Sequence, residues 1–167
     1  FTIRLQDGRE AALPYLHEGE IFYHRIEQMF FQRDADGYYV TDADKLVYRF
    51  SDRKNREGFA MISSITNPQV FKIRFEYDAK GNLTSITDSC DRLIKVQNDE
   101  MGRVTKIYTI ANNRRMDLMQ YRYDAAGNMV GNEDVSGSVK NFEYDGHLLV
   151  KLTNQSGHSF YWEYEGK

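Results

Sequence analysis

Tyr123-Asp124-Ala125-Ala126-Gly127-Asn128-Met129 is a heptad that recurs along this chain. Tyr77-Asp78-Ala79-Lys80-Gly81-Asn82-Leu83 differs from it at only two positions. Residues 98–104 keep the Asp, the Gly and the last apolar residue, and residues 144–148 and 164–166 are shorter echoes. The Tyr position falls at 77, 98 (where Asn stands), 123, 144 and 164, at intervals of 21, 25, 21 and 20. Self-similarity at a period near 20 predicts a repeat architecture.

Each heptad contains an Asp-x-x-Gly segment, which is typical of a tight turn. An Asp at the first position can accept a hydrogen bond from a backbone N–H two residues on, and a Gly at the fourth can adopt positive φ without a steric clash. Between aromatic and β-branched residues, this segment predicts a hairpin with a type I turn and a glycine bulge. The turn residues expected to shape the fold are Asp78, Gly81, Asp99, Gly102, Asp124, Gly127, Asp145 and Gly146.

Pairs of aromatic residues, two positions apart, precede the turns. They are Phe75 and Tyr77, Tyr121 and Tyr123, Phe142 and Tyr144, and Trp162 and Tyr164. Because side chains alternate along a strand, each pair lies on one face and the charged residue between its members lies on the other. We expect these rings to pack against those of the next unit across the sheet.

A second turn signal separates successive heptads, at residues 88–91, 112–113, 134–137 and 154–157. Two turns in each repeat predict strands of about 8 residues. The longest interval, 25 residues, predicts a longer connection around residues 111–116. Residues 71–167 are therefore expected to form an all-β meander of hairpin repeats, making a curved antiparallel sheet.

Residues 1–70 are expected to form a β-rich lead-in that is continuous with the hairpin array as one sheet system. Residues 20–32 fit a helical spacing almost as well as two strands. We favour strands, because Asp34-Ala35-Asp36-Gly37 then forms a turn. Residues 51–58 are highly charged and offer nothing apolar to bury, which predicts an exposed loop.

Composition limits the classes of partner. The net charge of −3 gives no electrostatic case for binding nucleic acid or an anionic membrane. No apolar run is long enough for a membrane span. The single cysteine, Cys90, permits no internal disulfide. The chain begins at Phe1 and not at Met, and we expect it to be a piece of a longer protein.

Residues that could carry chemistry do not form a recognisable site. Cys90 is flanked by Asp88 and Asp91, which oppose a thiolate nucleophile. The Asp pairs at 34/36 and 42/44 lack the distal Glu of a calcium-binding loop. The histidines share no metal-ligand spacing: His17, His24, His147 and His158. We predict no catalytic residue, no cofactor and no metal site.

The heptads resemble the YD repeat of the Rhs/YD-repeat family, which comprises bacterial polymorphic toxins and has toxin-complex subunits and teneurins as relatives. The Tyr-Asp-x-x-Gly-Asn-Leu/Met form at 77–83 and 123–129 carries the resemblance, which covers residues 71–167. It implies a non-enzymatic wall segment of a β-shell that encloses a C-terminal toxin and helps to deliver it. The implied partner is the remainder of the parent chain, including that toxin, and the implied location is secreted or cell-surface, reached through a secretion system.

The chain departs from this family pattern in two respects. It is too short to close a shell, and no Asp-Pro-x-Gly-type segment follows the repeats. Two alternatives therefore stay open. The aromatic face could bind carbohydrate or a protein partner, and open sheet edges could pair copies of the chain with one another.

Overall fold

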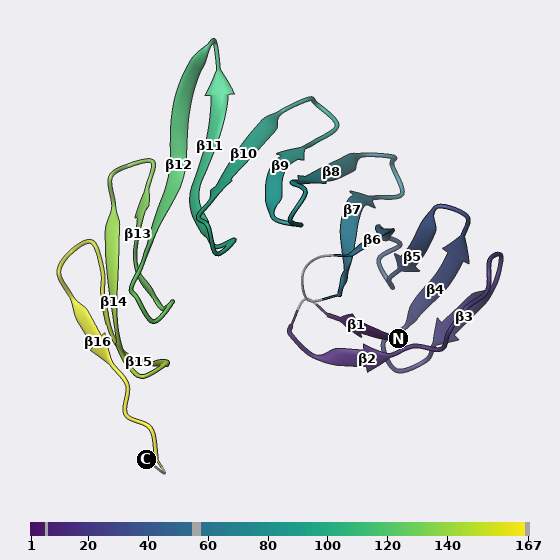
Figure 1. The fold of residues 1–167 in the computed structure, drawn as a ribbon, viewed down its shortest axis with the longest axis horizontal. Helices are drawn as coiled ribbons and strands as arrows, with labels where there is room; N and C mark the ends of the chain where they lie inside the picture. Colours follow the sequence, from purple (N-terminus) through teal and green to yellow (C-terminus); the bar gives the residue numbers. More distant parts are fainter. Residues whose placement is uncertain (6, 55–57, 166–167) are drawn as a thin grey trace. The chain divides into compact units, whose positions relative to one another are not determined.

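The computed structural model describes residues 1–5, 7–54 and 58–165, and every regular element in this part of the chain is a β-strand (Figure 1). The all-β prediction is confirmed. The chain divides into two compact units, Phe1–Arg92 and Leu93–Lys167. The predicted boundary at residue 70, between the lead-in and the repeats, rests on the sequence pattern and stays a prediction.

The first unit holds two antiparallel sheets. The strands β1 and β2 pair only with each other, whereas β3 to β9 follow in chain order, each pairing with the next. The lead-in is thus β-rich, but the prediction of one sheet system is wrong for its first hairpin. The strand bounds are β1 (Thr2–Arg4), β2 (Glu10–Ala12), β3 (Ile21–His24), β4 (Met29–Asp34), β5 (Gly37–Thr41), β6 (Val47–Lys54), β7 (Ala60–Thr66), β8 (Lys72–Tyr77) and β9 (Leu83–Thr87).

The ambiguous segment at residues 20–32 forms strands, as favoured. Tyr23 pairs with Phe30 across the β3–β4 hairpin, and Asp34 pairs with Gly37 across the next turn. The exposed loop predicted at 51–58 is wrong for its first half, because β6 continues through Lys54. Residues 55–57 lie outside the described residues.

A small apolar core belongs to the first unit. Leu13 and Leu16, from the segment after β2, pack with Met29, Phe31 and Val40 of β4 and β5. Phe31 is only 4% exposed. Its ring stacks on Tyr38, which lies on the neighbouring strand β5, with ring centroids 5.5 Å apart. The lead-in thus covers one face of its hairpins with side chains from outside the sheet.

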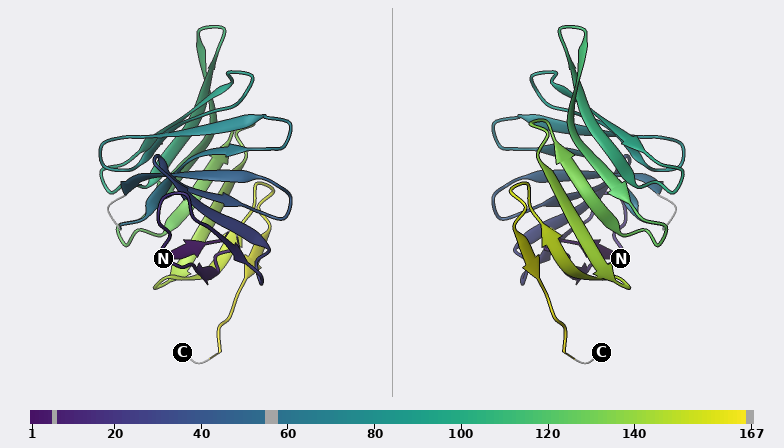
Figure 2. Two further views of the ribbon diagram at one scale, coloured as in Figure 1. Left: turned by 90° about the vertical axis from the view of Figure 1, so that its right-hand side faces the viewer. Right: turned by 90° about the vertical axis from the view of Figure 1, so that its left-hand side faces the viewer.

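The second unit is a meander in which each strand from β10 to β16 pairs antiparallel with the next (Figure 2). Among its described residues only Val96 and Gly131 are buried, so it has no enclosed core of its own. The bounds are β10 (Leu93–Asn98), β11 (Val104–Ala111), β12 (Arg114–Tyr123), β13 (Met129–Asp134), β14 (Val139–Asp145), β15 (Leu148–Thr153) and β16 (Ser159–Tyr161).

The longest repeat interval is not taken up by a loop. Ala111 pairs with Arg114 around a tight turn made by Asn112 and Asn113. Both asparagines have positive φ, 50° and 57°, which is typical of a two-residue type I′ hairpin. The extra residues lengthen β11 to 8 and β12 to 10 residues, whereas the other strands of this unit have 3 to 7. The predicted longer connection at 111–116, and the uniform length of about 8 residues, are therefore wrong.

Candidate functional site: turns and hairpin junctions

The Asp-x-x-Gly segments form one kind of turn. In the turn between β12 and β13, the N–H of Gly127 donates to the carbonyl of Asp124 at 3.1 Å, and the N–H of Asp124 donates to the carbonyl of Asn128 at 3.0 Å. Gly127 has φ of 93°, which a residue with a Cβ rarely adopts. These are the hydrogen bonds of a type I turn closed by a glycine bulge.

The aspartate side chain holds the turn from inside. Oδ1 of Asp124 accepts from the backbone N–H of Asn128 at 2.8 Å, and Oδ2 accepts from Nδ2 of Asn128 at 3.0 Å. Asp99 does the same with Arg103, whose N and Nε donate at 2.9 and 2.7 Å. The fifth residue of the turn, Asn128 or Arg103, is therefore tied to the first by both its backbone and its side chain.

These hydrogen bonds stabilise the ionised carboxylate. The side-chain donor of Asn128 lowers the pKa of Asp124 below its ordinary value. The pKa values of Asp78 and Asp99 are lowered mainly by the backbone N–H groups of Asn82 and Arg103. Negative charge is thus part of the turn, because a protonated carboxyl group accepts such bonds less well.

Among the predicted turn residues, Asp78 with Gly81 and Asp99 with Gly102 form this same turn, with φ of 87° and 84° at the glycines. Asp145 differs. It is the last residue of β14 and pairs with Leu148, so the turn there consists of Gly146 and His147 alone. The expectation of Asp145 as a turn residue is corrected to a strand end, because a two-residue turn leaves no place for an Asp-x-x-Gly cycle.

The same hydrogen-bond cycle also occurs outside the heptads. Val70 and Asp91 take the fourth position with φ of 69° and 57°, in turns that begin at Asn67 and Asp88. A β-branched residue such as Val70 is strained at positive φ. In the turns of this kind from Asp42 onward, an Asx residue at the first position is therefore the constant feature, and glycine at the fourth is the unstrained choice.

The heptad tyrosines act through their hydroxyl groups. Each donates to a backbone carbonyl on an earlier strand, at 2.8 to 2.9 Å: Tyr77 to Ile62, Tyr123 to Val104, Tyr144 to Met129 and Tyr164 to Leu149. We call such a contact a tyrosine clasp. The phenols of Tyr77 and Tyr123 are partly desolvated, and burial raises the pKa of both above the ordinary value.

The clasps follow a register rule. Met129 and Leu149, which accept from Tyr144 and Tyr164, are the residues paired with Tyr123 and Tyr144. These two clasps therefore reach the strand position opposite the tyrosine of the hairpin before, and the clasp of Tyr123 reaches Val104 opposite Asn98, which stands at the tyrosine position of its repeat. The β13–β14 ladder ends at the pair Gly131 and Asn141, so the hydroxyl of Tyr144 binds a carbonyl beyond the last paired residues.

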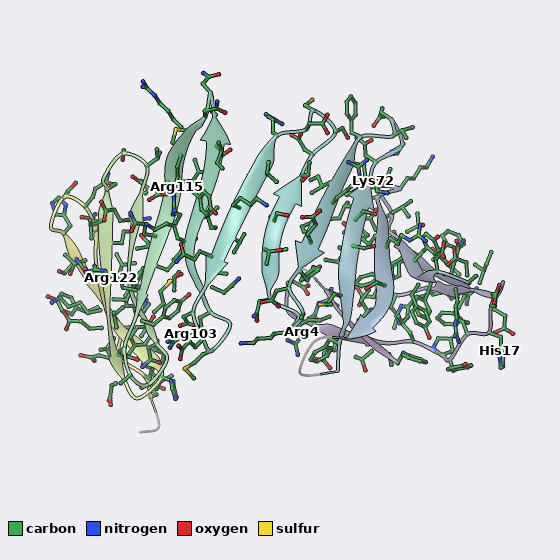
Figure 3. All side chains as sticks on the ribbon, turned by 45° about the horizontal axis from the view of Figure 1, so that its top comes forward. Arg4, His17, Lys72, Arg103, Arg115 and Arg122 are labelled. Carbon is green, nitrogen blue, oxygen red and sulfur yellow. The ribbon has the colours of Figure 1, made fainter. Side chains whose placement is uncertain are left out.

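The fifth turn residue also reaches the next hairpin. Nδ2 of Asn128 donates to the carbonyl of Gly146 at 3.1 Å, and Oδ1 of Asn128 lies 2.7 Å from Nδ1 of His147. Arg103, labelled in Figure 3, has its guanidinium 4.6 Å from the ring centroid of Tyr123. We call each set of contacts between a turn and the following hairpin a junction.

The remaining predicted aromatic residues are placed unevenly. Phe75 lies in β8, Tyr121 in β12 and Phe142 in β14, each two residues before a clasp tyrosine. Trp162 and Tyr164 lie after the end of β16, and the prediction that both are strand residues is wrong. Among the described residues, close ring pairs occur in the lead-in, as with Phe31 and Tyr38, and the repeat tyrosines rely on their hydroxyls instead.

A glycine in β13 makes room for an arginine. Arg122, Gly131 and Asn141 stand side by side on three neighbouring strands. Nη2 of Arg122, labelled in Figure 3, donates to Oδ1 of Asn141 at 2.8 Å. A Cβ on Gly131 would lie 2.5 Å from this Nη2 and 3.1 Å from the Lys140 carbonyl. Arg122 therefore crosses directly over Gly131, a contact that the heptad pattern does not indicate.

The arrangement is suited to holding strands together. Within the described residues, no group of three His, Cys, Asp or Glu side chains is placed to hold a metal ion. In that same part of the chain, no helix is long and apolar enough to span a membrane. Cys90 is exposed in the turn after β9, where the carboxylate of Asp88 accepts from its backbone N–H at 2.8 Å. What the residues of this site do chemically is to donate and accept hydrogen bonds within and between hairpins.

Comparison with known proteins identifies this architecture. The teneurin YD-shell family model matches residues 35–167. The chain is 26% identical, over 162 residues, to double-stranded DNA deaminase toxin A of Burkholderia cenocepacia (strain H111), covering 93% of this chain and 11% of that protein. The crystal structure of TcdB2-TccC3 shares the fold with a TM-score of 0.52 and 13% identity, covering 82% of this chain and 9% of that one. The chain thus spans about a tenth of each relative, and it belongs to the Rhs/YD-repeat family as a YD-shell segment.

Proposed function

We propose that this chain is a non-enzymatic wall segment of a β-shell, which encloses a toxic cargo carried C-terminally in the same polypeptide and helps to deliver it outside the producing cell. The turn residues and aromatic pairs predicted from the sequence are its structural determinants, apart from the corrected Asp145. Its partner is the remainder of the parent chain.

The observation that carries this proposal is the junction. The turn is hydrogen-bonded to the next hairpin through Asn128, Met129 and Tyr144. Contacts of this kind allow hairpins to be added without a second layer of structure to cover them. Such nearest-neighbour contacts are how repeat proteins build extended surfaces. The relatives support the same proposal. One of them is named a toxin, and it is about nine times longer than the part of it that this chain matches.

Limited proteolysis of the full-length parent protein tests the proposal. We expect the segment downstream of the repeats to resist proteinase K within the parent and to be digested rapidly when it is expressed alone. Mass spectrometry of the fragments over time measures the difference. Equal digestion rates in the two settings would rule out enclosure of that segment.

A second candidate, a carbohydrate-binding module, is favoured by one feature. Tyr161 and Trp162 are 70% and 40% exposed beside each other at the end of β16. Aromatic faces of this kind can stack on sugar rings. A glycan array with the Trp162→Ala variant tests this, with Phe71→Ala, at an aromatic residue 61% exposed in the first unit, as the control. Binding that is lost only with Trp162→Ala would support the carbohydrate function, and no binding by the unmodified chain would end it.

A further inference from the structure

Tyr123 and Asp124 are neighbours in sequence but act at different junctions. The hydroxyl of Tyr123 donates backwards to Val104, at the start of β11. The carboxylate of Asp124 closes the turn that follows, where it accepts from Asn128. No hydrogen bond of either side chain depends on the other. The Tyr-Asp pair of the heptad is therefore not a unit of interaction.

We propose that the coupled pair is the aspartate of one hairpin and the tyrosine of the next, so that Asp124 acts together with Tyr144, twenty residues further on. The turn aspartate then serves as a positioning residue for the clasp of the following hairpin. This inference goes beyond the shell function, since it concerns how one hairpin fixes the next and needs no cargo.

The path from Asp124 to Tyr144 is short. Asp124 fixes Asn128 through its backbone N–H and its side-chain amide. The next residue, Met129, offers the carbonyl that accepts from Tyr144 at 2.9 Å. Loss of the Asp124 carboxylate therefore removes two of the three hydrogen bonds between Asp124 and Asn128 and loosens the residue immediately before the clasp acceptor.

Asn128 provides a second, parallel connection. Its Nδ2 donates to both Oδ2 of Asp124 and the carbonyl of Gly146. This assigns Oδ1 as the acceptor, so that Nδ1 of His147 donates to it. The amide is thus held in one orientation by Asp124 and reaches the turn that directly follows Tyr144 and Asp145.

The junction before it uses a different residue for the same purpose. Arg103 is the fifth residue of the Asp99 turn, and its Nε is held by Oδ2 of Asp99. Its guanidinium lies over the ring of Tyr123, whose hydroxyl donates to the adjacent Val104. An amide in one junction and a guanidinium in the other both connect the turn aspartate to the next hairpin. Because this connection recurs with different chemistry, it favours a coupling between the turn aspartate and the next hairpin over a chance contact.

A double-mutant cycle on the 167-residue chain measures the coupling. Tyr144→Phe removes one hydrogen bond and should raise the unfolding equilibrium constant about 3- to 10-fold. In the background of Asp124→Ala we expect this factor to shrink at least about threefold, because the acceptor is then held less firmly. Urea titrations followed by circular dichroism give each constant.

Two controls separate coupling from general destabilisation. Tyr164→Phe removes the clasp to Leu149, which shares no partner with Asp124, and its effect should be the same in both backgrounds within about twofold. Tyr121 lies on the same strand as Tyr123, but its hydroxyl forms no clasp. Tyr121→Phe should therefore leave the unfolding equilibrium constant nearly unchanged.

The double-mutant cycle either supports or overturns the coupling of Asp124 with Tyr144. If Asp124→Ala unfolds the chain, Asn128→Ala replaces it, since this substitution removes the amide bridge and leaves the Asp124 carboxylate in place. Additive effects of Tyr144→Phe in the variant background would overturn the proposal. So would a coupling to Tyr164→Phe as large as the coupling to Tyr144→Phe.

Discussion

The two units of this chain hold their strands in different ways. In the first unit, segments outside the sheet cover one face, and Leu13, Leu16, Met29, Phe31 and Val40 form a buried cluster. In the second, only Val96 and Gly131 are buried among the described residues. There the polar contacts of the turns and clasps recur from hairpin to hairpin. Apolar burial therefore concentrates stability in one place, whereas the junctions distribute it along the chain.

This difference explains why the heptad is so regular. A single layer of strands cannot rely on an enclosed core, so each hairpin has to be fixed by contacts with its neighbours. Those contacts depend on particular groups at fixed positions: an Asx side chain, a residue at positive φ, and a phenol. A packed core tolerates many apolar sequences, and the lead-in accordingly shows no such heptad.

The largest effect is expected from emptying the core of the first unit. Phe31→Ala removes a ring that is 4% exposed and stacked on Tyr38, and it should reduce the free energy of unfolding by about 3–5 kcal/mol. Leu152→Ala in the half-buried β15 is the matched change in the second unit and should cost less than half as much. Urea denaturation of both variants gives the comparison. Equal losses would show that the second unit also depends on apolar burial.

A second test crowds the polar face of the second unit. Gly131→Ala places a Cβ 2.5 Å from Nη2 of Arg122 and 3.1 Å from the carbonyl of Lys140, and it should cost about 1–3 kcal/mol. Because the arginine side chain can move away, the cost should fall when Arg122→Ala is added. Thermal unfolding of the single and double variants measures it. A harmless Gly131→Ala would mean that Arg122 does not lie across the glycine in solution.

Exchanging glycine and valine at equivalent turn positions tests the contribution of the backbone. Gly127→Val should cost about 1–2 kcal/mol, because φ is 93° there. Val70→Gly, where φ is 69°, should instead stabilise the chain by up to about 1 kcal/mol. Changes of opposite sign in the melting temperature are the expected result. A lower melting temperature in both variants would indicate that the side chain of Val70, although 78% exposed, contributes contacts.

The smallest effect is expected from acid. The pKa values of Asp78, Asp99 and Asp124 are lowered in the folded chain, chiefly by the N–H groups and side chains of Asn82, Arg103 and Asn128. A lowered pKa contributes stability that is complete above the unfolded value of about 3.9 and is lost as the pH falls through the folded value. At pH values below about 4, the urea concentration at the unfolding midpoint should therefore decrease.

Asp124→Asn is the control for this pH dependence. Asn154 shows that an asparagine can hold the same turn, since its Oδ1 accepts from the N–H groups of Ser156 and His158 at 3.0 Å. The variant should fold and lose less stability on acidification than the unmodified chain. An identical pH profile would show that the Asp124 carboxylate does not contribute to the acid sensitivity.

The sequence alone identifies the turns well, because their chemistry is local. The hydrogen bonds of Asp124 and Gly127 all lie within five consecutive residues, so the pattern contains everything that the turn needs. The strands at residues 20–32 follow in the same way from the turn at Asp34–Gly37. By contrast, residues 51–54 were assigned to a loop because the stretch 51–58 is charged, yet the backbone of β6 continues through Lys54, so charge alone does not decide where a strand ends.

The junctions could not be read from the sequence. Which carbonyl the Tyr144 hydroxyl reaches depends on the offset between two hairpins, and that offset is set by bulges such as the one between Arg122 and Tyr123. Unlike the glycine bulge that closes each Asp-x-x-Gly turn, this register shift involves no residue at positive φ that would mark it in the sequence. For the same reason, the side chains of Asn128 and Arg103 were recognised as parts of a motif but not as connections between hairpins.

The hairpin of β11 and β12 shows at which end a hairpin of this chain can be longer than its neighbours. Its extra residues extend the end that carries Asn112 and Asn113, while the opposite end keeps the contacts of Arg103 and Tyr123 with no alteration. Along one margin of the second unit, the turn and clasp contacts fix the spacing of the hairpins. Along the other, hairpins are free to grow, and the Asn112–Asn113 tip is accordingly the position where an inserted epitope or reporter peptide would be displayed with the least disturbance to the neighbouring strands.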